Sequence, residues 1–223
     1  MEDSALKNWD EMTEAEKFKE IFRNTVKRPG AEKLLAWLED IGFFTAPAST
    51  KYHGNYAGGL VDHSNNVYRR LVKMAADEDR RLQHTSPEYS AETLAVVALL
   101  HDVCKADAYR LDEDGKYTYT NNFPAGHGEK SIIIIMGFMY LTEEEVLAIR
   151  WHMGAWDSAV KGGCRDCDYA FAASRLAAML HIADMMATHL DEREDITPDR
   201  ASGDFEKYIK TEQKKAAAAF EIR

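Results

Sequence analysis

The feature that most limits how this chain can fold is an apolar run that ends in two ionisable residues. Residues 86–105 read SPEYSAETLAVVALLHDVCK, with Ser and Pro at the start and His101 and Asp102 after the apolar stretch. Apolar side chains on every side predict a helix buried in the centre of a domain. Ionisable groups at the end of a buried helix are costly unless something binds them. A cation would neutralise Asp102 and occupy the lone pair of His101.

The rest of the pattern is mostly helical and predicts an all-α fold. Capping boxes at Thr13 and Thr142 predict two helix starts, one helix running to about Val26 and the other to His152. Asp114-Gly115, between arms that contain Tyr and Thr, predicts a small β-hairpin over residues 109–120. Other helices are expected at AEKLLAWLED before Gly42, at 60–82, at 126–140 and, as one long helix, at 167–192.

Composition limits the class of protein. The chain has 223 residues, of which 45% are hydrophobic, and this is enough for one domain with a real core. We therefore expect residues 1–223 to form a single domain, because no linker or repeat interrupts the pattern. The net charge of −10 disfavours a stable complex with nucleic acid, which needs Lys and Arg against phosphates. The oligomeric state stays open.

The sequence also indicates the location of the protein and the redox state of its cysteines. The N-terminus is acidic and polar, unlike a targeting signal, and the longest apolar stretch is too short to span a membrane. We therefore expect a cytoplasmic protein with no membrane contact. Three cysteines make no disulfide framework. Cys164 and Cys167 form a CxxC pair, which leaves ordinary reduced thiols or an accessory metal or redox pair open.

Several histidines and aspartates fall at the ends of these helices and are candidate metal ligands. Any one histidine alone is more often a core or surface residue, but the set as a whole favours a metal site. Imidazole and carboxylate together suit Mn, Fe, Ni, Co or Zn, and also Mg where carboxylate and water dominate. Adjacent helical residues point about 100° apart, so Asp102 can share one ion with His101 or bridge two ions. The candidates are His63, His101, Asp102, His127, His152 and Asp184.

Five motifs in this order resemble the HD superfamily of metal-dependent phosphohydrolases: YHGNYAGGLVDHS, ALLHDVCKAD, GHGEKS, IRWHMGAWD and LHIADMMA. The closest resemblance is to small bacterial HD hydrolases and to the HD domain of certain 3′→5′ exoribonucleases. It implies an HD-type helical core at about 52–190, with peripheral helices at 10–47 and 204–222. Cys104 stands where the family usually has glycine, and Trp151 where several relatives have a histidine.

Residue by residue, the resemblance assigns His63, His101, Asp102 and Asp184 to the minimal divalent-metal site. It assigns His127 and His152 to the two-metal subgroup, so one or two ions are expected. It implies hydrolysis of a phosphoester by metal-activated water, with Asp102 as a catalytic group. Lys105 is expected to contact a substrate phosphate or the developing charge, and Lys130 to reach the substrate. The alternative for Lys105 is a surface lysine at a helix C-terminus, and for Lys130 it is a solvated charge beside Glu129.

The substrate and the reaction class leave alternatives open. The acidic balance favours a small phosphorylated substrate such as a nucleotide over a nucleic acid, although short oligonucleotides, as in an exoribonuclease, stay possible. A di-iron oxygenase with the same ligand set and a non-catalytic nucleotide sensor are the other readings. Tyr109 and Trp156 can stack on a base or belong to the core, and the hairpin can form one wall of the pocket.

Overall fold

The computed structural model describes residues 8–50, 54–120 and 123–192. These residues belong to one compact unit, Met1–Glu192. The expected helix at 204–222 lies outside the described residues. The prediction of a single domain over the whole chain therefore stays a prediction.

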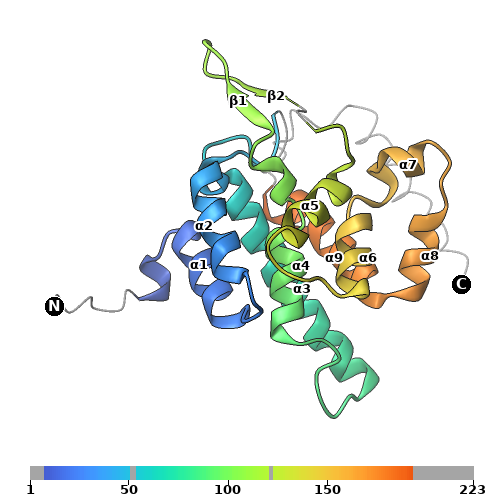
Figure 1. Cartoon of the computed structure of the whole chain (residues 1–223). Coiled ribbons are helices and arrows are strands. Elements are labelled where there is room, and N and C mark those ends of the chain that lie inside the picture. The colour runs from blue at the N-terminus through green and yellow to red at the C-terminus, as the bar shows by residue number, and fades with distance from the viewer. Residues whose placement is uncertain (1–7, 51–53, 121–122, 193–223) are drawn as a thin grey trace, which may run out of the picture. The chain divides into compact units, whose positions relative to one another are not determined.

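The described part of the chain is helical apart from one hairpin, which confirms the expected all-α class with a small β-hairpin (Figure 1). The α-helices are α1 (Glu14–Thr25), α2 (Ala31–Ile41), α3 (Gly59–Leu82), α4 (Ala91–Leu100), α5 (His127–Met136), α6 (Glu143–Trp151), α7 (Ser158–Lys161), α8 (Asp166–Ala173) and α9 (Arg175–Met186). Short 3-10 turns are η1 (Trp9–Glu11), η2 (Phe43–Thr45), η3 (Val103–Lys105) and η4 (Gly154–Trp156), and η5 (Ala187–Asp191) is a π-helical turn. Strands β1 (Tyr109–Leu111) and β2 (Tyr117–Tyr119) pair antiparallel, with Tyr109 opposite Tyr119.

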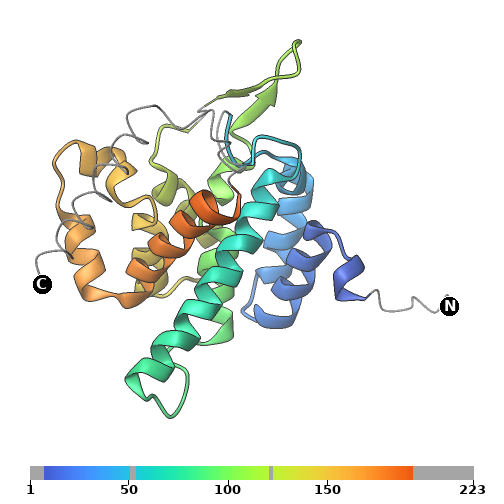
Figure 2. The same ribbon diagram turned by 180° about the vertical axis from the view of Figure 1, so that it is seen from behind.

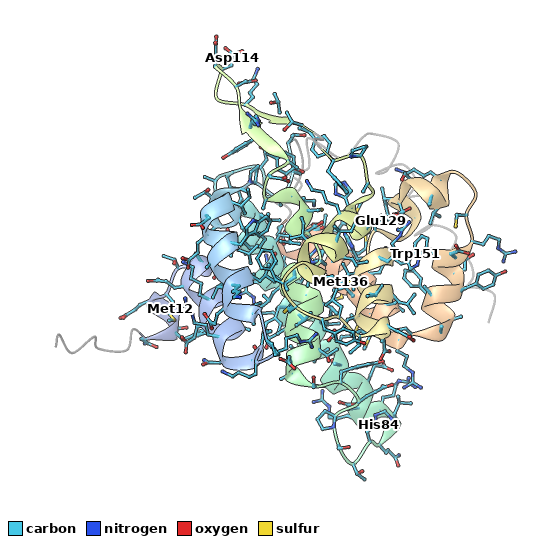
Figure 3. The ribbon with its side chains drawn as sticks, in the orientation of Figure 1. Met12, His84, Asp114, Glu129, Met136 and Trp151 are labelled. Atoms are coloured by element: carbon cyan, nitrogen blue, oxygen red, sulfur yellow. The ribbon has the colours of Figure 1, made fainter. Side chains whose placement is uncertain are left out.

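Helix α4 is the centre of the core, as its apolar sequence predicts. Every residue from Leu94 to Leu100 is buried. Helices α1, α3 and α6 pack against it, and α9 packs along α3. Figure 2 shows α3 and α9 lying side by side, while the hairpin and the C-terminal end of α3 project in opposite directions. Asp114 marks the tip of the hairpin and His84 the loop after α3 (Figure 3).

The central helix is shorter than expected. It begins at Ala91, because the side chain of Ser90 caps it by accepting a hydrogen bond from the N–H of Thr93. It ends at Leu100, and Asp102 leaves the helical path at φ −109° and ψ 18°. The backbone then turns tightly through η3, where the N–H of Lys105 donates to the Asp102 carbonyl at 2.9 Å. This turn aims the side chains of His101 and Asp102 away from the helix axis.

The prediction of one long helix over 167–192 is wrong. Ser174 has an extended backbone, with φ −134° and ψ 117°, and it separates α8 from α9. Its hydroxyl accepts from the N–H of Ala177 at 3.1 Å and donates to Glu144 at 2.9 Å. Ser174 is thus an N-cap held by a neighbouring helix, and this tertiary contact outweighs the helix propensity of the flanking alanines.

Both predicted capping boxes are present, at Thr13 with Glu16 and at Thr142 with Glu145. Helix α5 is shorter than expected, since it ends at Met136 rather than near 140, and Gly137 follows as its C-cap. Within the described ranges, no helix combines the length and the apolarity that crossing a membrane requires.

Glu145 also forms the main buried ion pair between the N-terminal helices and α6. Its side chain is fully buried, and its two oxygens accept from the guanidinium of Arg28 at 2.8 and 2.9 Å. The same guanidinium donates to the carbonyl of Tyr140 at 2.8 Å. A paired, bidentate contact of this kind fixes the orientation of two segments more than 100 positions apart in the chain.

We expect Glu145→Ala to lower the free energy of unfolding by about 3 kcal/mol, because it leaves a partly buried guanidinium unpaired and removes one half of a capping box. Urea denaturation followed by circular dichroism measures the effect. Glu143→Ala is the control, since Glu143 is exposed in the same turn of α6. Equal stabilities for the two variants would contradict the prediction.

Candidate metal centre

The first candidate ligand lies near the start of α3, where two glycines allow a close backbone approach. A Cβ added to Gly59 would come within 2.0 Å of the carbonyl oxygen of Gly54, so only glycine fits there. Gly58, at φ +91°, is the N-cap of α3. The loop before α3 therefore folds tightly onto the helix start, and His63 follows one turn later as a buried side chain.

His63, His101 and Asp184 form one group of possible ligands. Each offers one ligand atom, and these atoms lie within 4.8 Å of one another. His63 Nε2 lies 3.2 Å from Asp184 Oδ1 and 3.3 Å from His101 Nε2. The three residues come from α3, the end of α4 and the last turn of α9. The fold thus brings together side chains that are 121 positions apart at the extremes, from 63 to 184.

Asp102 links this group to a second one, made by His101, Asp102 and His152. Asp102 Oδ2 lies 3.3 Å from His101 Nε2, while Asp102 Oδ1 lies 3.4 Å from His152 Nε2. Asp102 Oδ1 and His152 Nε2 are both buried, and neither has a hydrogen-bond partner among the described residues. A buried carboxylate oxygen facing an imidazole nitrogen without a hydrogen bond is the donor set that a divalent cation completes.

The backbone sets the protonation of two of these imidazoles. His101 Nδ1 lies 2.8 Å from the carbonyl oxygen of Ala98, and His152 Nδ1 lies 2.7 Å from that of Ile149. Both carbonyls belong to the last turn of a helix, where intrahelical donors are absent. A carbonyl can only accept, so Nδ1 carries the proton and Nε2 presents its lone pair inward when the ring is neutral. This is the form of histidine that binds a metal ion.

His63 is held by a carboxylate that the sequence analysis missed. Its Nδ1 lies 3.0 and 3.1 Å from the two oxygens of Glu192, and Asn66 donates to the same carboxylate at 2.9 Å. Glu192 lies eight positions after Asp184, just past the π-helical turn η5. No motif marks it, because only the path of that turn brings it back onto α3. A carboxylate behind a ligating imidazole fixes the ring and raises its basicity.

Charge is balanced inside the centre. Burial alone would lower the pKa of His63, but the hydrogen bonds that its ring donates to Asp184 and Glu192 outweigh burial and raise the pKa to about 10. Burial opposes ionisation of Asp102, but the Lys105 ammonium and His101 hold the pKa of that carboxyl well below its usual range. Asp184 has a lowered pKa for a similar reason, with His63 as the main favourable partner against burial. The carboxylates are therefore anions that require positive charge beside them.

His127 and Cys104 form a further group of possible ligands with Asp102. His127 is the first residue of α5, and its Nδ1 lies 3.5 Å from Cys104 Sγ. One ligand atom from each of Asp102, Cys104 and His127 falls within 4.8 Å of the others. Burial lowers the pKa of His127 and, for the Cys104 thiol, raises the pKa to about 12. All six expected ligands are therefore neighbours of at least one other member of the set.

The two predicted substrate lysines differ in their surroundings. Lys105 Nζ lies 2.7 Å from Asp102 Oδ2, and Lys105 lines the cavity described below. Lys130 forms an ion pair with Asp107 and is not among the residues that line that cavity. Both lysines are largely buried rather than at the surface. Lys105 is therefore positioned beside the candidate ligands, whereas Lys130 is directed to a separate carboxylate.

A cavity of about 650 Å³ opens onto the candidate ligands. Asp102, Lys105, His127, His152 and Asp184 line it together with three aromatic residues, Tyr109, Tyr119 and Trp156. Tyr109 and Tyr119 come from the two strands of the hairpin, and their rings lie 5.7 Å apart. The hairpin thus contributes to the cavity wall, as the sequence analysis expected. A cavity of this size is in the range of small-molecule binding sites.

Comparison with known proteins gives two findings. The model of the HD domain family matches residues 60–200 of this chain. A curated relative, the dihydroneopterin 2′,3′-cyclic phosphate phosphodiesterase of Methanocaldococcus jannaschii, is 34% identical over 82 residues. The match covers 37% of this chain and only 32% of the relative's length. No solved structure matches the chain with significance.

The Glu192 contact gives a prediction about metal affinity. We expect Glu192→Gln to weaken Mn²⁺ binding by about 10- to 100-fold, because it removes the anion that orients His63 and raises its basicity. Isothermal titration calorimetry on the full chain measures the dissociation constant. Asp191→Asn is the control, since Asp191 pairs with Arg70 and does not contact His63 in the described contacts. Unchanged affinity in Glu192→Gln would contradict the role.

Proposed function

This chain belongs to the HD domain family, and on that premise we propose that it is a metal-dependent phosphohydrolase. HD domains bind divalent metal ions, and this chain carries His and Asp groups that could hold one. The observation that carries the proposal is the buried pair of Asp102 Oδ1 and His152 Nε2 at the cavity, each without a hydrogen-bond partner among the described residues. Such a pair is costly unless a cation joins it.

We propose that Asp102 would help to hold two ions, one through each of its oxygens. Its Oδ2 faces His101 and His63, at 3.3 and 3.7 Å from their Nε2 atoms. Its Oδ1 faces His152 at 3.4 Å. The two oxygens therefore face different imidazoles, which supports one ion that would be held with His63, His101 and Asp184 and another that would be held with His127 and His152. Imidazole and carboxylate donors suit Mn, Fe, Co, Ni or Zn.

When bound, the ions polarise phosphoryl oxygens and make water nucleophilic at neutral pH. The chain's own groups have separate parts. Asp102 holds its charge through the Lys105 ammonium, 2.7 Å away, and Lys105 also lines the cavity. We propose that Lys105 donates a hydrogen bond to a non-bridging phosphate oxygen as negative charge develops there. For Lys130, which pairs with Asp107, we propose an indirect part in shaping the cavity.

We propose that the substrate is a small phosphodiester joined to a flat heteroaromatic ring, such as a nucleoside 2′,3′-cyclic phosphate. Tyr109, Tyr119 and Trp156 line the cavity with Lys105, so that an aromatic group and a phosphate can both be contacted. Tyr119 is about half exposed, which leaves its ring available for stacking. The curated relative is named for a cyclic phosphate carried by a pterin, and a pterin is also a flat heteroaromatic ring.

The reaction is tested with the purified full chain. With Mn²⁺ present and oxygen removed, we expect the chain to hydrolyse 2′,3′-cyclic AMP to a nucleoside monophosphate. Chromatography of the reaction mixture measures the product. A chelator and Asp102→Ala should each abolish turnover, because both remove the centre. Glu113→Gln, an exposed change at the hairpin tip, is the control and should retain activity.

Turnover that requires iron and oxygen would instead support a di-iron oxygenase. Nucleotide binding without turnover of any phosphoester, across a panel of metals, would support a sensor.

The ring contact is tested separately. Tyr119→Ala should raise KM for 2′,3′-cyclic AMP by about tenfold, since stacking on an aromatic side chain contributes roughly 1–3 kcal/mol per base. KM for ribose 2′,3′-cyclic phosphate, which has no base, should be unchanged. Tyr117→Ala is the matched control, because Tyr117 lies on the same strand and does not line the cavity. An equal rise in KM for both substrates would contradict a stacking role.

A further inference from the structure

We propose that Cys104 is itself a metal ligand, and that its thiolate binds an ion together with His127 and Asp102. The inference rests on the metal centre proposed above and deepens it. A Cys104 thiolate would give one of the two ion positions a sulfur ligand. That position would then prefer metal ions that bind thiolates well. The HD motif usually has glycine at this position, which offers no donor, so the property belongs to this chain's own residue.

The distance between Cys104 and His127 is the first observation. Cys104 Sγ lies 3.5 Å from His127 Nδ1. In tetrahedral zinc sites the metal–sulfur bond is about 2.3 Å and the metal–nitrogen bond about 2.0–2.1 Å, which separates the two ligand atoms by about 3.6 Å. The observed separation, which is also that of a thiol–imidazole hydrogen bond, fits two ligands of a single ion. Ligand atoms of Asp102, Cys104 and His127 all lie within 4.8 Å of one another.

The unpartnered oxygen of Asp102 is the second, independent observation. Asp102 is only 2% exposed, and its Oδ1 has no hydrogen-bond partner within the described parts of the chain. Cys104, two residues later, is equally buried. His127 and Asp102 both line the cavity, so an ion between them would face a bound substrate. Lys105 pairs with Asp102 Oδ2, and Oδ1 is left as a buried anionic oxygen that a cation would satisfy.

The fold holds Cys104 and His127 in register. The N–H of Cys104 donates to the hydroxyl of Ser131 at 3.3 Å. Ser131 lies one turn after His127 on α5, on the same side of the helix. Turn η3 packs against α5 along this contact. The two candidate ligands are therefore fixed against each other by a backbone hydrogen bond as well as by packing.

The coordination step balances simply. The S–H bond of Cys104 breaks, its proton leaves to solvent, and the sulfur lone pair forms the bond to the ion. No electrons are transferred to an acceptor. Thiolate favours Zn²⁺ and Co²⁺ over Mg²⁺ and Mn²⁺, which prefer oxygen donors. We therefore expect this chain to retain zinc-type ions more tightly than its histidine and aspartate content alone would give.

The test is a Co²⁺ titration of the metal-free full chain, followed by absorption spectroscopy. A thiolate bound to Co²⁺ gives an intense charge-transfer band in the near ultraviolet, whereas nitrogen and oxygen ligands give only weak visible bands. We expect the intense band in the parent chain and its loss in Cys104→Ala. The double variant Cys164→Ser, Cys167→Ser is the matched control, because it removes the other thiols, and it should keep the band. Cys104→Ala should also weaken Zn²⁺ binding by at least about tenfold, while Mn²⁺ affinity changes little.

The outcomes separate this inference from the function on which it rests. Weak visible bands without the intense band mean that Co²⁺ binds without sulfur, and this overturns the Cys104 assignment alone. A band that persists in Cys104→Ala and disappears in the double variant assigns the thiolate to the CxxC pair, and it also overturns the proposal. No Co²⁺ binding at all overturns the metal centre itself. Cys104→Ser, with far-ultraviolet circular dichroism on every variant, provides a second substitution at the same position should Cys104→Ala fail to fold.

Discussion

The constraint on which this structure depends is a buried carboxylate. Asp102 is almost completely buried at the end of the most apolar helix of the described unit, and ionisation there is unfavourable unless positive charge surrounds it. Lys105 lies 2.7 Å away, and two imidazoles lie at 3.3 and 3.4 Å. Each of these groups is carried by a different turn or helix end, so satisfying one anion fixes how η3, α4 and α6 meet.

Helix ends supply what the ligands need. His101 and His152 are the C-caps of α4 and α6, and each hydrogen-bonds the carbonyl three residues earlier. Those carbonyls lack intrahelical donors only because the helices stop there. The same residue thus ends a helix, satisfies its last turn and directs a nitrogen lone pair inward. A histidine in the middle of a helix finds no free backbone carbonyl in its own helix, so its Nδ1–H would need a partner from another element.

The sequence predicts the features that local chemistry decides. The capping boxes at Thr13 and Thr142, the hairpin at Asp114-Gly115 and the buried helix before His101 follow from residue types and spacing, and they are present. The break at Ser174 does not follow, because it needs the hydroxyl contact with Glu144 on another helix. The contact of Glu192 with His63 and that of Cys104 with His127 could not be predicted from the sequence for the same reason. Only the assembled fold brings these residues together.

In the proposed centre, protons compete with metal ions for several of the donors around Asp102. Lys105 and His63 lie on the Oδ2 side, and both carry positive charge near neutral pH, since the pKa of His63 is raised to about 10. An ion entering that side must displace the proton from His63. On the Oδ1 side, burial lowers the pKa of His127, whereas Asp102 raises the pKa of His152 against the effect of burial. In the proposed two-ion centre, an ion therefore competes with protons at His63 and at His152, and both positions should fill more readily as the pH rises.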